Sequence, residues 1–250
     1  MLGKLIKYDF KAMARTMVPI YIALLALTLV FSGMVRLHLD EGFVFTIFAI
    51  LFVFTLIASM FASVVFVVGR FINGLLKNEG YLSFALPVDT ATHIAAKVIN
   101  AIIWALLEGL MLCVCLLIMG AVMGSVREVA LFFKEAFKAF GLIEKDVLLA
   151  ALKMVAILIL EMIASICLIY AALAVGHMFG RNQKMIAVAF LIAVCIARSF
   201  LLTTIIRSLP DAAAYYMHVD DIILIVLPII FAGLYSTLTW FILDRKLNLE

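Results

Sequence analysis

Charged residues are scarce in this chain. Asp, Glu, Lys and Arg make up 14% of its 250 residues, and apolar residues make up 68%. A soluble domain has about one quarter charged residues and about half apolar ones. The composition therefore excludes an ordinary soluble domain. A formal net charge of +3 is also too small to indicate a nucleic-acid partner.

Cysteine and histidine are equally sparse, with four residues of each type. All four cysteines fall inside apolar runs, and the histidines are scattered near the ends of these runs. Neither set has the spacing of a zinc site or of a redox pair. We therefore expect no metal site and no disulfide framework.

The motifs of common enzyme classes are also missing. The chain has no glycine-rich loop ending in Lys-Ser or Lys-Thr, no Ser/His/Asp grouping and no His-Glu-x-x-His run. It also lacks the paired membrane aspartates of an intramembrane protease. We expect a protein that is not an enzyme and that holds no cofactor of its own.

What the chain does have is six long apolar runs. About 20 apolar residues are needed for a helix to cross a bilayer, and the runs reach that length without the alternation typical of a membrane β-barrel. The sequence thus predicts an all-α, polytopic membrane protein forming a single transmembrane domain over residues 1–250, with no room for a soluble catalytic domain. The expected spans are residues 17–35, 43–69, 94–123, 153–176, 185–206 and 222–241.

Basic residues are distributed unevenly between the expected loops. Eleven fall in the N-terminal segment, near the turns after the second and fourth spans, and in the C-terminal segment, whereas the short opposite turns carry Arg36 and Arg207 only. The longer segment 125–153 is an exception, because its basic residues are interleaved with acidic ones. Since Lys and Arg collect on cytosolic loops, we expect both termini in the cytosol.

Two segments outside the spans have amphipathic patterns. Residues 1–16 place Phe10 and Met13 on an apolar face and four basic residues opposite, as in an interfacial helix, but Asp9 falls within the apolar face. That carboxylate either snorkels at a bend or finds a partner because the face contacts protein. Residues 126–140, in the outer segment 125–150, form a second amphipathic pattern, which fits either a lid or part of an exit gate.

The turn between the second and third spans, residues 73–92, is too apolar for a solvated loop. It would expose several apolar side chains unless a partner or its own spans covered them: Tyr81, Leu82, Phe84 and Leu86. Glu79-Gly80 ends the second helix, Leu86-Pro87 ends a short helical segment, and Asp89 or Thr90 can cap the third span. We expect a short helix on the cytosolic face, or alternatively a hairpin packed on its own spans.

This turn resembles the coupling segment of type-2 ABC exporter permeases. The resemblance rests on Glu79-Gly80, Leu82, Leu86-Pro87-Val88 and Lys97, and the run Lys7-Tyr8-Asp9-Phe10-Lys11 is similar to the interfacial elbow helix of that family. Six spans and cytosolic termini fit the same family. One departure concerns the larger outer segment, which often lies between spans five and six in the family but lies between spans three and four here.

The resemblance implies a permease subunit in the cell membrane of a bacterium. It would pair with a second permease, identical or different, and with cytosolic ABC ATPase subunits that hold ATP and magnesium. The coupling residues would lie in the turn just described, and Arg181 in the second cytosolic turn would make a lesser contact. The very apolar spans favour hydrophobic or amphipathic cargo, including peptides and antimicrobial peptides, while drugs, lipids and ions stay open.

Three charged residues lie inside the expected spans: Glu108, Glu161 and Arg198. Such residues usually face the bundle interior and pair, so we expect Arg198 near at least one of the two glutamates. The group either locks the spans together or forms a polar patch in the cargo path. Gly176 and Gly180 form a small-xxx-small pair that indicates close helix packing.

Two other functions are compatible with these features. A membrane assembly factor or sensor could use the same turn to bind a different cytosolic partner. A secondary transporter would be favoured by inverted internal symmetry and broken spans, neither of which the sequence shows clearly.

Overall fold

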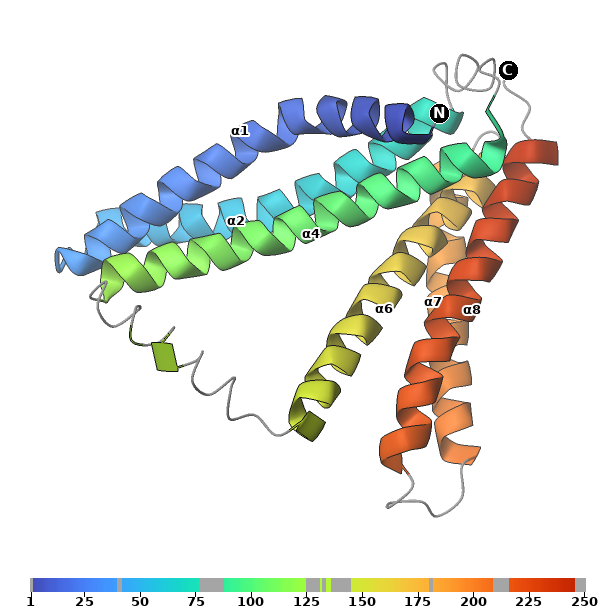
Figure 1. The fold of residues 1–250 in the computed structure, drawn as a ribbon. Coiled ribbons are helices and arrows are strands. Elements are labelled where there is room, and N and C mark those ends of the chain that lie inside the picture. Colours follow the sequence, from blue (N-terminus) through green and yellow to red (C-terminus); the bar gives the residue numbers. More distant parts are fainter. Residues whose placement is uncertain are drawn as a thin grey trace. The chain divides into compact units, whose positions relative to one another are not determined.

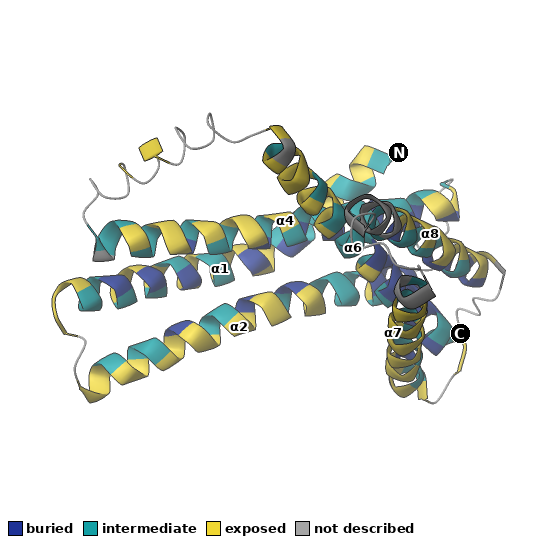
Figure 2. Ribbon diagram, turned by 90° about the horizontal axis from the view of Figure 1, so that it is seen from below, coloured by how far each residue is buried: buried dark blue, intermediate teal, exposed yellow. Residues whose placement is uncertain are grey.

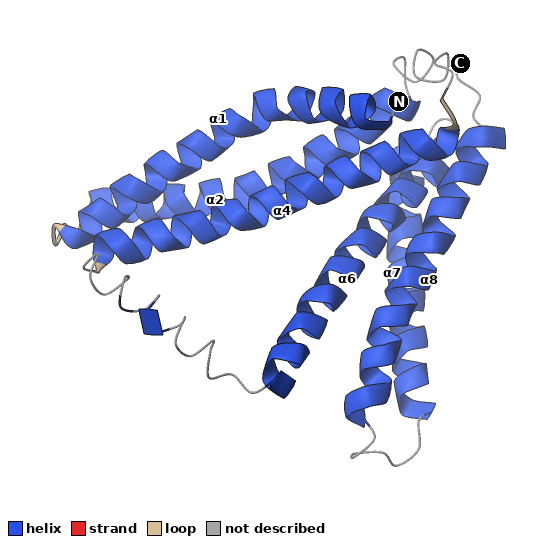
Figure 3. Ribbon diagram, viewed as in Figure 1, coloured by secondary structure: helices blue, strands red, loops and turns tan. Residues whose placement is uncertain are grey.

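The computed structural model describes residues 2–39, 42–76, 88–124, 131, 134–135, 145–179, 182–208 and 216–245. Within these ranges all the regular structure is helical (Figure 3). Six helices are long and apolar enough to cross a membrane, which confirms the predicted all-α architecture with six spans. They are α1 (Leu2–Arg36), α2 (Phe43–Phe71), α4 (Thr90–Met123), α6 (Lys145–His177), α7 (Gln183–Ser208) and α8 (Tyr216–Arg245), shown in Figure 1.

The N-terminal amphipathic segment and the first span form one continuous helix. α1 begins at Leu2 and ends at Arg36, and its ribbon bends along its length in Figure 1. Pro19 lies inside it, and a proline removes a backbone hydrogen bond and can bend a helix without ending it. The sequence pattern predicts a separate helix over residues 1–16, whereas the structure has one continuous helix. The change of pattern near residue 17 marks a change of surroundings and not a break in the backbone.

The cytosolic turn of the sequence prediction lies between two described ends. α2 passes into a π-helix, η1 (Ile72–Leu76), and α4 begins at Thr90. The backbone carbonyl of Asp89 accepts hydrogen bonds from the N–H groups of Thr92 and His93, at 2.9 and 3.3 Å, which places Asp89 at the N-cap position. The Thr90 hydroxyl instead donates to the Asp244 carboxylate of α8 at 3.3 Å.

The chain divides into two compact units. Unit 2 comprises residues 6–67 and 100–148, and therefore holds most of α1 and α2 and the C-terminal two thirds of α4. These three helices run side by side (Figures 1 and 2). Their core is built around Met13, Met17 and Trp104, with Phe10 stacked on the Trp104 ring at a centroid distance of 5.0 Å.

Unit 1 comprises residues 1–5, 68–99 and 149–250. Its core is formed by Cys167, Leu168 and Ala171 of α6 with Tyr235 of α8, and side chains of α7 pack against this cluster. A second contact joins the end of α2 to α6, where Phe71 and Tyr170 stack with ring centroids 4.1 Å apart. The helices of this unit are thus held together mainly by apolar and aromatic packing.

Large apolar side chains are exposed along the outer faces of the helices. α2 alone exposes Phe43, Phe54 and Phe61, which are 81%, 68% and 69% exposed. Figure 2 shows such exposed positions along most of the length of the helices of both units. Contiguous apolar surface of this extent would aggregate in water, so it fits a protein whose solvent is lipid.

Gly176 provides a test of the close packing that its sequence spacing predicts. A Cβ at this position would lie 2.5 Å from the backbone oxygen of Gln183 and 2.8 Å from the Cβ of Ala187. We expect Gly176→Ala to destabilise the protein by about 1–3 kcal/mol, because backbone atoms in the first turns of α7 would have to move. The measurement is the thermal unfolding temperature of the purified protein in detergent.

Gly233→Ala is the matched control, because a Cβ at Gly233 in the same unit meets nothing within 4 Å. Its effect should lie between zero and a gain of about 1 kcal/mol, since alanine restricts the unfolded backbone. Equal unfolding temperatures for the two variants would show that the α6–α7 contact is looser than described.

Candidate functional site

The root of the turn between the second and third spans, residues 73–92, is the best-defined candidate site at the expected cytosolic end. η1 continues α2 with Gly74, Leu75 and Leu76 buried. A π-helix is rare and is frequently found at functional positions. The residues that carry the family resemblance directly after it lie outside the described part of the chain: Glu79, Gly80, Tyr81, Leu82, Phe84, Leu86 and Pro87.

Lys97, another residue of that resemblance, is described. It lies in α4, is only 9% exposed, and reaches over Gly74 of η1. A Cβ on Gly74 would come within 2.8 Å of the Lys97 Nζ, so the end of the lysine side chain lies directly against this glycine. The Tyr170 hydroxyl donates to the Lys97 backbone carbonyl at 3.3 Å, which ties the same turn of α4 to α6.

A cavity adjoins this root, and residues at the second expected cytosolic turn also line it. Its volume is about 290 Å³, and its lining includes Asn73 and Leu76 of η1, His177 at the end of α6, and Gln183 and Lys184 at the start of α7. The His177 Nε2 and the Leu76 carbonyl form a short hydrogen bond. The described ends of both turns are therefore joined within unit 1, although Arg181 itself lies outside the described residues.

The intramembrane charges fall into two separate groups. In unit 1, the Arg198 guanidinium of α7 donates to both carboxylate oxygens of Glu161 in α6. The Arg198 Cζ also lies 5.3 Å from the centroid of the Phe231 ring of α8, within the range of a cation–π contact. One pair thus links three helices, and it joins Arg198 to one of the two glutamates that the sequence offered.

Glu108 is held differently, by hydroxyl groups of unit 2. The Tyr21 hydroxyl of α1 donates to its Oε2 at 2.8 Å, and two serines of α2 donate as well: Ser63 to Oε2 at 2.7 Å and Ser59 to Oε1 at 2.9 Å. Glu108 is 7% exposed. Among the residues described, its partners are these three hydroxyls and no cation.

Ser59, Ser63 and Tyr21 were missed by sequence reasoning, although two of them had a recognisable signal. Ser59 and Ser63 are four residues apart and so share one face of an otherwise apolar helix. Polar residues repeated on one face of a span commonly face another helix and hydrogen-bond to it. Tyr21 gave no such signal, because a single tyrosine in a span does not indicate a hydrogen-bond partner on another helix.

Asp9 lies in a buried position of α1 and is 8% exposed. Its helix neighbours Phe10 and Met13 pack against Trp104 of α4 within the same unit. This face of the N-terminal segment therefore contacts protein, and Asp9 has an interaction partner. The outer amphipathic segment cannot be treated in the same way, because nearly all of residues 125–144 lie outside the description.

A wider, mostly apolar groove of about 700 Å³ lies along unit 1. It is lined by the first turns of α4 from Asp89 to Ile99, by Ile163 and Cys167 of α6, and by α8 from Ala232 to Trp240. Asp89 is the one acidic residue in its lining. The groove is large enough for an apolar ligand of drug size.

No protein-family model, curated protein or solved structure matches this chain. Among the described residues, no group of three or more His, Cys, Asp or Glu side chains could hold a metal ion.

Proposed function

We propose that this chain is the membrane-spanning permease subunit of an ATP-driven ABC exporter. The proposal rests on one observation above all, the run from Glu79 to Lys97 between the second and third spans, which resembles the coupling segment of such permeases. The position of Lys97 supports it. This residue is buried over Gly74, so the two ends of the coupling turn are packed together in unit 1.

The proposed mechanism uses this root as the point that receives force. Cytosolic ATPase subunits bind and hydrolyse ATP with magnesium, and their motion displaces the coupling turn. η1, Lys97 and the His177–Leu76 hydrogen bond connect the turn to α2, α4 and α6, so a displacement at the turn is passed to three spans. A second permease subunit, identical or different, completes the pathway in the cell membrane.

The proposed cargo is hydrophobic or amphipathic, with peptides as the leading class. The mostly apolar groove with Asp89 at one end supports this choice, because it offers apolar surface together with one acidic group. Drugs and lipids share this chemistry and fit the same architecture. An ion would not need such a surface.

The decisive experiment is affinity purification of the full chain in mild detergent, followed by identification of the bound chains. We expect an ABC ATPase to co-purify, and Leu82→Asp or Phe84→Asp to remove most of it and to abolish transport while leaving the permease inserted. The reason is that apolar side chains on a cytosolic turn need a groove on a partner to cover them. The permease purified without its ATPase should hydrolyse no ATP.

Leu39→Asp is the matched control, because Leu39 is 54% exposed in the short turn between α1 and α2, on the opposite side of the membrane in the predicted topology. It should retain the ATPase. Binding of a cytosolic protein other than an ABC ATPase would favour the assembly or sensor function. Undiminished ATPase binding and transport in both coupling variants would refute the assignment of this turn.

A further inference from the structure

The Glu108 carboxyl differs from the other intramembrane carboxyl in having no cationic partner among the described residues. Glu161 is neutralised by Arg198, whereas the three partners of Glu108 are the hydroxyls of Tyr21, Ser59 and Ser63. An ionised carboxylate is an acceptor only, so all three hydroxyls can donate to it at once. These bonds stabilise the anion, but unlike an ion pair they do not cancel its charge.

Ser59 allows the same site to hold a neutral carboxylic acid. Its Oγ lies 2.9 Å from the Glu108 Oε1 and also 2.9 Å from the backbone carbonyl of Leu56. When Glu108 is protonated, its O–H donates to the Ser59 Oγ, and the Ser59 proton turns to the Leu56 carbonyl. Both protonation states are then satisfied by the same heavy-atom positions, with only a hydroxyl hydrogen rotating.

We propose that Glu108, with Ser59 as its reversible hydrogen-bond partner, is a proton-binding site inside the membrane. The step is simple: the carboxylate takes a proton delivered by water, its charge changes from negative to neutral, and the proton returns to water when the site empties. Burial of both residues favours a ligand as small as a proton, since Ser59 is 0% exposed. The inference is independent of the ABC assignment.

The turns of α1, α2 and α4 around the site carry one carboxyl, that of Glu108. The neighbouring turns of α1 present Tyr21, and between Arg15 and Arg36 this helix has no charged residue. α2 has none between Phe43 and Val67. Within residues 100–123 of α4, Glu108 is accompanied by two cysteines and by no other titratable side chain. A change in charge within these turns of unit 2 can therefore be attributed to one carboxyl.

The test is infrared difference spectroscopy of the full chain, reconstituted in vesicles of a zwitterionic phospholipid and titrated from about pH 5 to about pH 9, a range that buried carboxyls can reach. We expect a carboxylic-acid C=O band at the acidic end, replaced by a carboxylate band at the alkaline end. Glu108→Gln should lack this change, whereas Glu161→Gln, in the other unit, should retain it.

The hydroxyl variants test the arrangement without removing the carboxyl. Ser63→Ala and Tyr21→Phe each remove a donor to the anion, so the acid band should persist to a pH about one unit higher. Ser59→Ala should cause a smaller shift in the pH at which the acid band disappears. This variant removes a donor to the anion and an acceptor for the acid together.

Three outcomes would overturn the proposal. The first two are no acid band at any pH and an acid band that never changes. The third is loss of the acid band on adding sodium at constant pH, which would identify a small-cation site in place of a proton site. All of these readouts use the permease alone, so they stay informative even if no ABC ATPase binds the chain.

Discussion

Replacing Arg198 by leucine should destabilise the protein by about 3–5 kcal/mol, because Glu161 would be left in the span without its partner. Removing one member of an ion pair in a medium of low dielectric leaves an uncompensated charge, and a charge at the centre of a span costs roughly 2.5–3.5 kcal/mol on insertion scales. The loss of the contact with the Phe231 ring adds to this cost. Unfolding in detergent, followed by circular dichroism, measures the effect.

The double variant Arg198→Leu/Glu161→Leu separates the cost of leaving Glu161 unpaired from the cost of losing the arginine side chain itself. It should recover most of the stability, since an apolar pair of similar volume is often neutral relative to an ion pair. Arg36→Leu serves as the single-site control, because Arg36 lies at the exposed end of α1 and donates to the Val122 carbonyl at 3.3 Å. It should cost no more than about 1 kcal/mol.

Cargo transport decides between the two roles that the sequence left open for this pair. If the pair serves the cargo path, Arg198→Leu should keep its stability and change cargo-stimulated ATPase activity of the assembled transporter. A variant that is both stable and fully active would contradict both roles.

Trp104→Ala should be the most damaging change in unit 2, at about 3–5 kcal/mol. The indole is 2% exposed, stacks on Phe10 at a centroid distance of 5.0 Å and contacts Met13 and Met17. Helices in lipid are held together by packing and hydrogen bonds, so a cavity at the point where α1 meets α4 removes much of that attraction. The same unfolding measurement applies.

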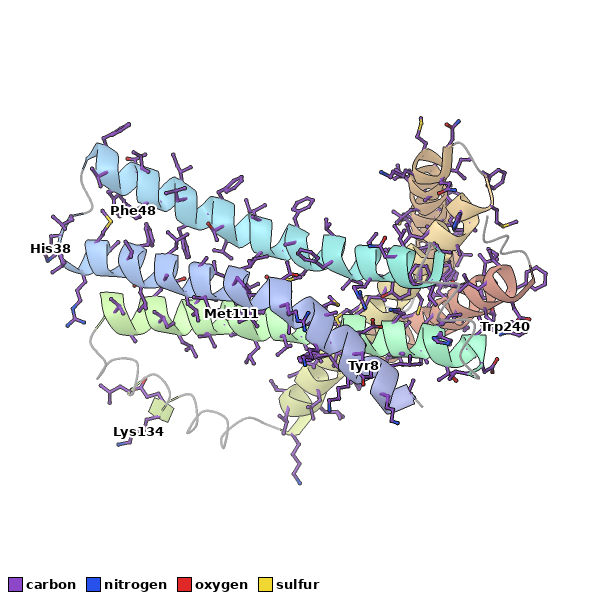
Figure 4. All side chains as sticks on the ribbon, turned by 90° about the horizontal axis from the view of Figure 1, so that it is seen from above. Tyr8, His38, Phe48, Met111, Lys134 and Trp240 are labelled. Carbon is purple, nitrogen blue, oxygen red and sulfur yellow. The ribbon has the colours of Figure 1, made fainter. Side chains whose placement is uncertain are left out.

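Two controls accompany this variant. Trp240→Ala removes the other tryptophan of the chain, which lies near the C-terminal end of α8 and is 37% exposed (Figure 4). It should cost less than half as much. Trp104→Phe should be nearly neutral, because it keeps a ring against Phe10 and removes an indole N–H that has no hydrogen-bond partner within the described residues. A neutral Trp104→Ala would mean that α1 is not held at this point.

The six spans could be predicted from the sequence because unbroken hydrophobicity is a local property. Each span was visible in its own residues, without reference to its neighbours. The continuity of α1 was not visible in this way, because amphipathicity reports the surroundings of a helix and not its ends. η1 was missed for a similar reason, since Asn73-Gly74 indicates only that an α-helix is weakened there.

The grouping of the buried charges shows where sequence reasoning stops. Their positions inside apolar runs identified Glu108, Glu161 and Arg198 as residues that need partners. The sequence did not show which of the two glutamates pairs with the arginine. That choice depends on which helices are neighbours, and Glu108 found hydroxyls on α1 and α2 in place of a cation. Neutral donors are common in any span, so only tertiary structure distinguishes the ones that matter.

The π-helix at the end of α2 also changes the angular phase of the helix up to Leu76. An α-helix advances by about 100° per residue, and a π segment accommodates one residue beyond the α-helical count. The side chains at the end of η1 are thus rotated by about one residue step about the helix axis, relative to their positions on an unbroken α-helix. Leu75 and Leu76 are both buried in this rotated setting, and deletion of a single residue from η1 would turn them away from it.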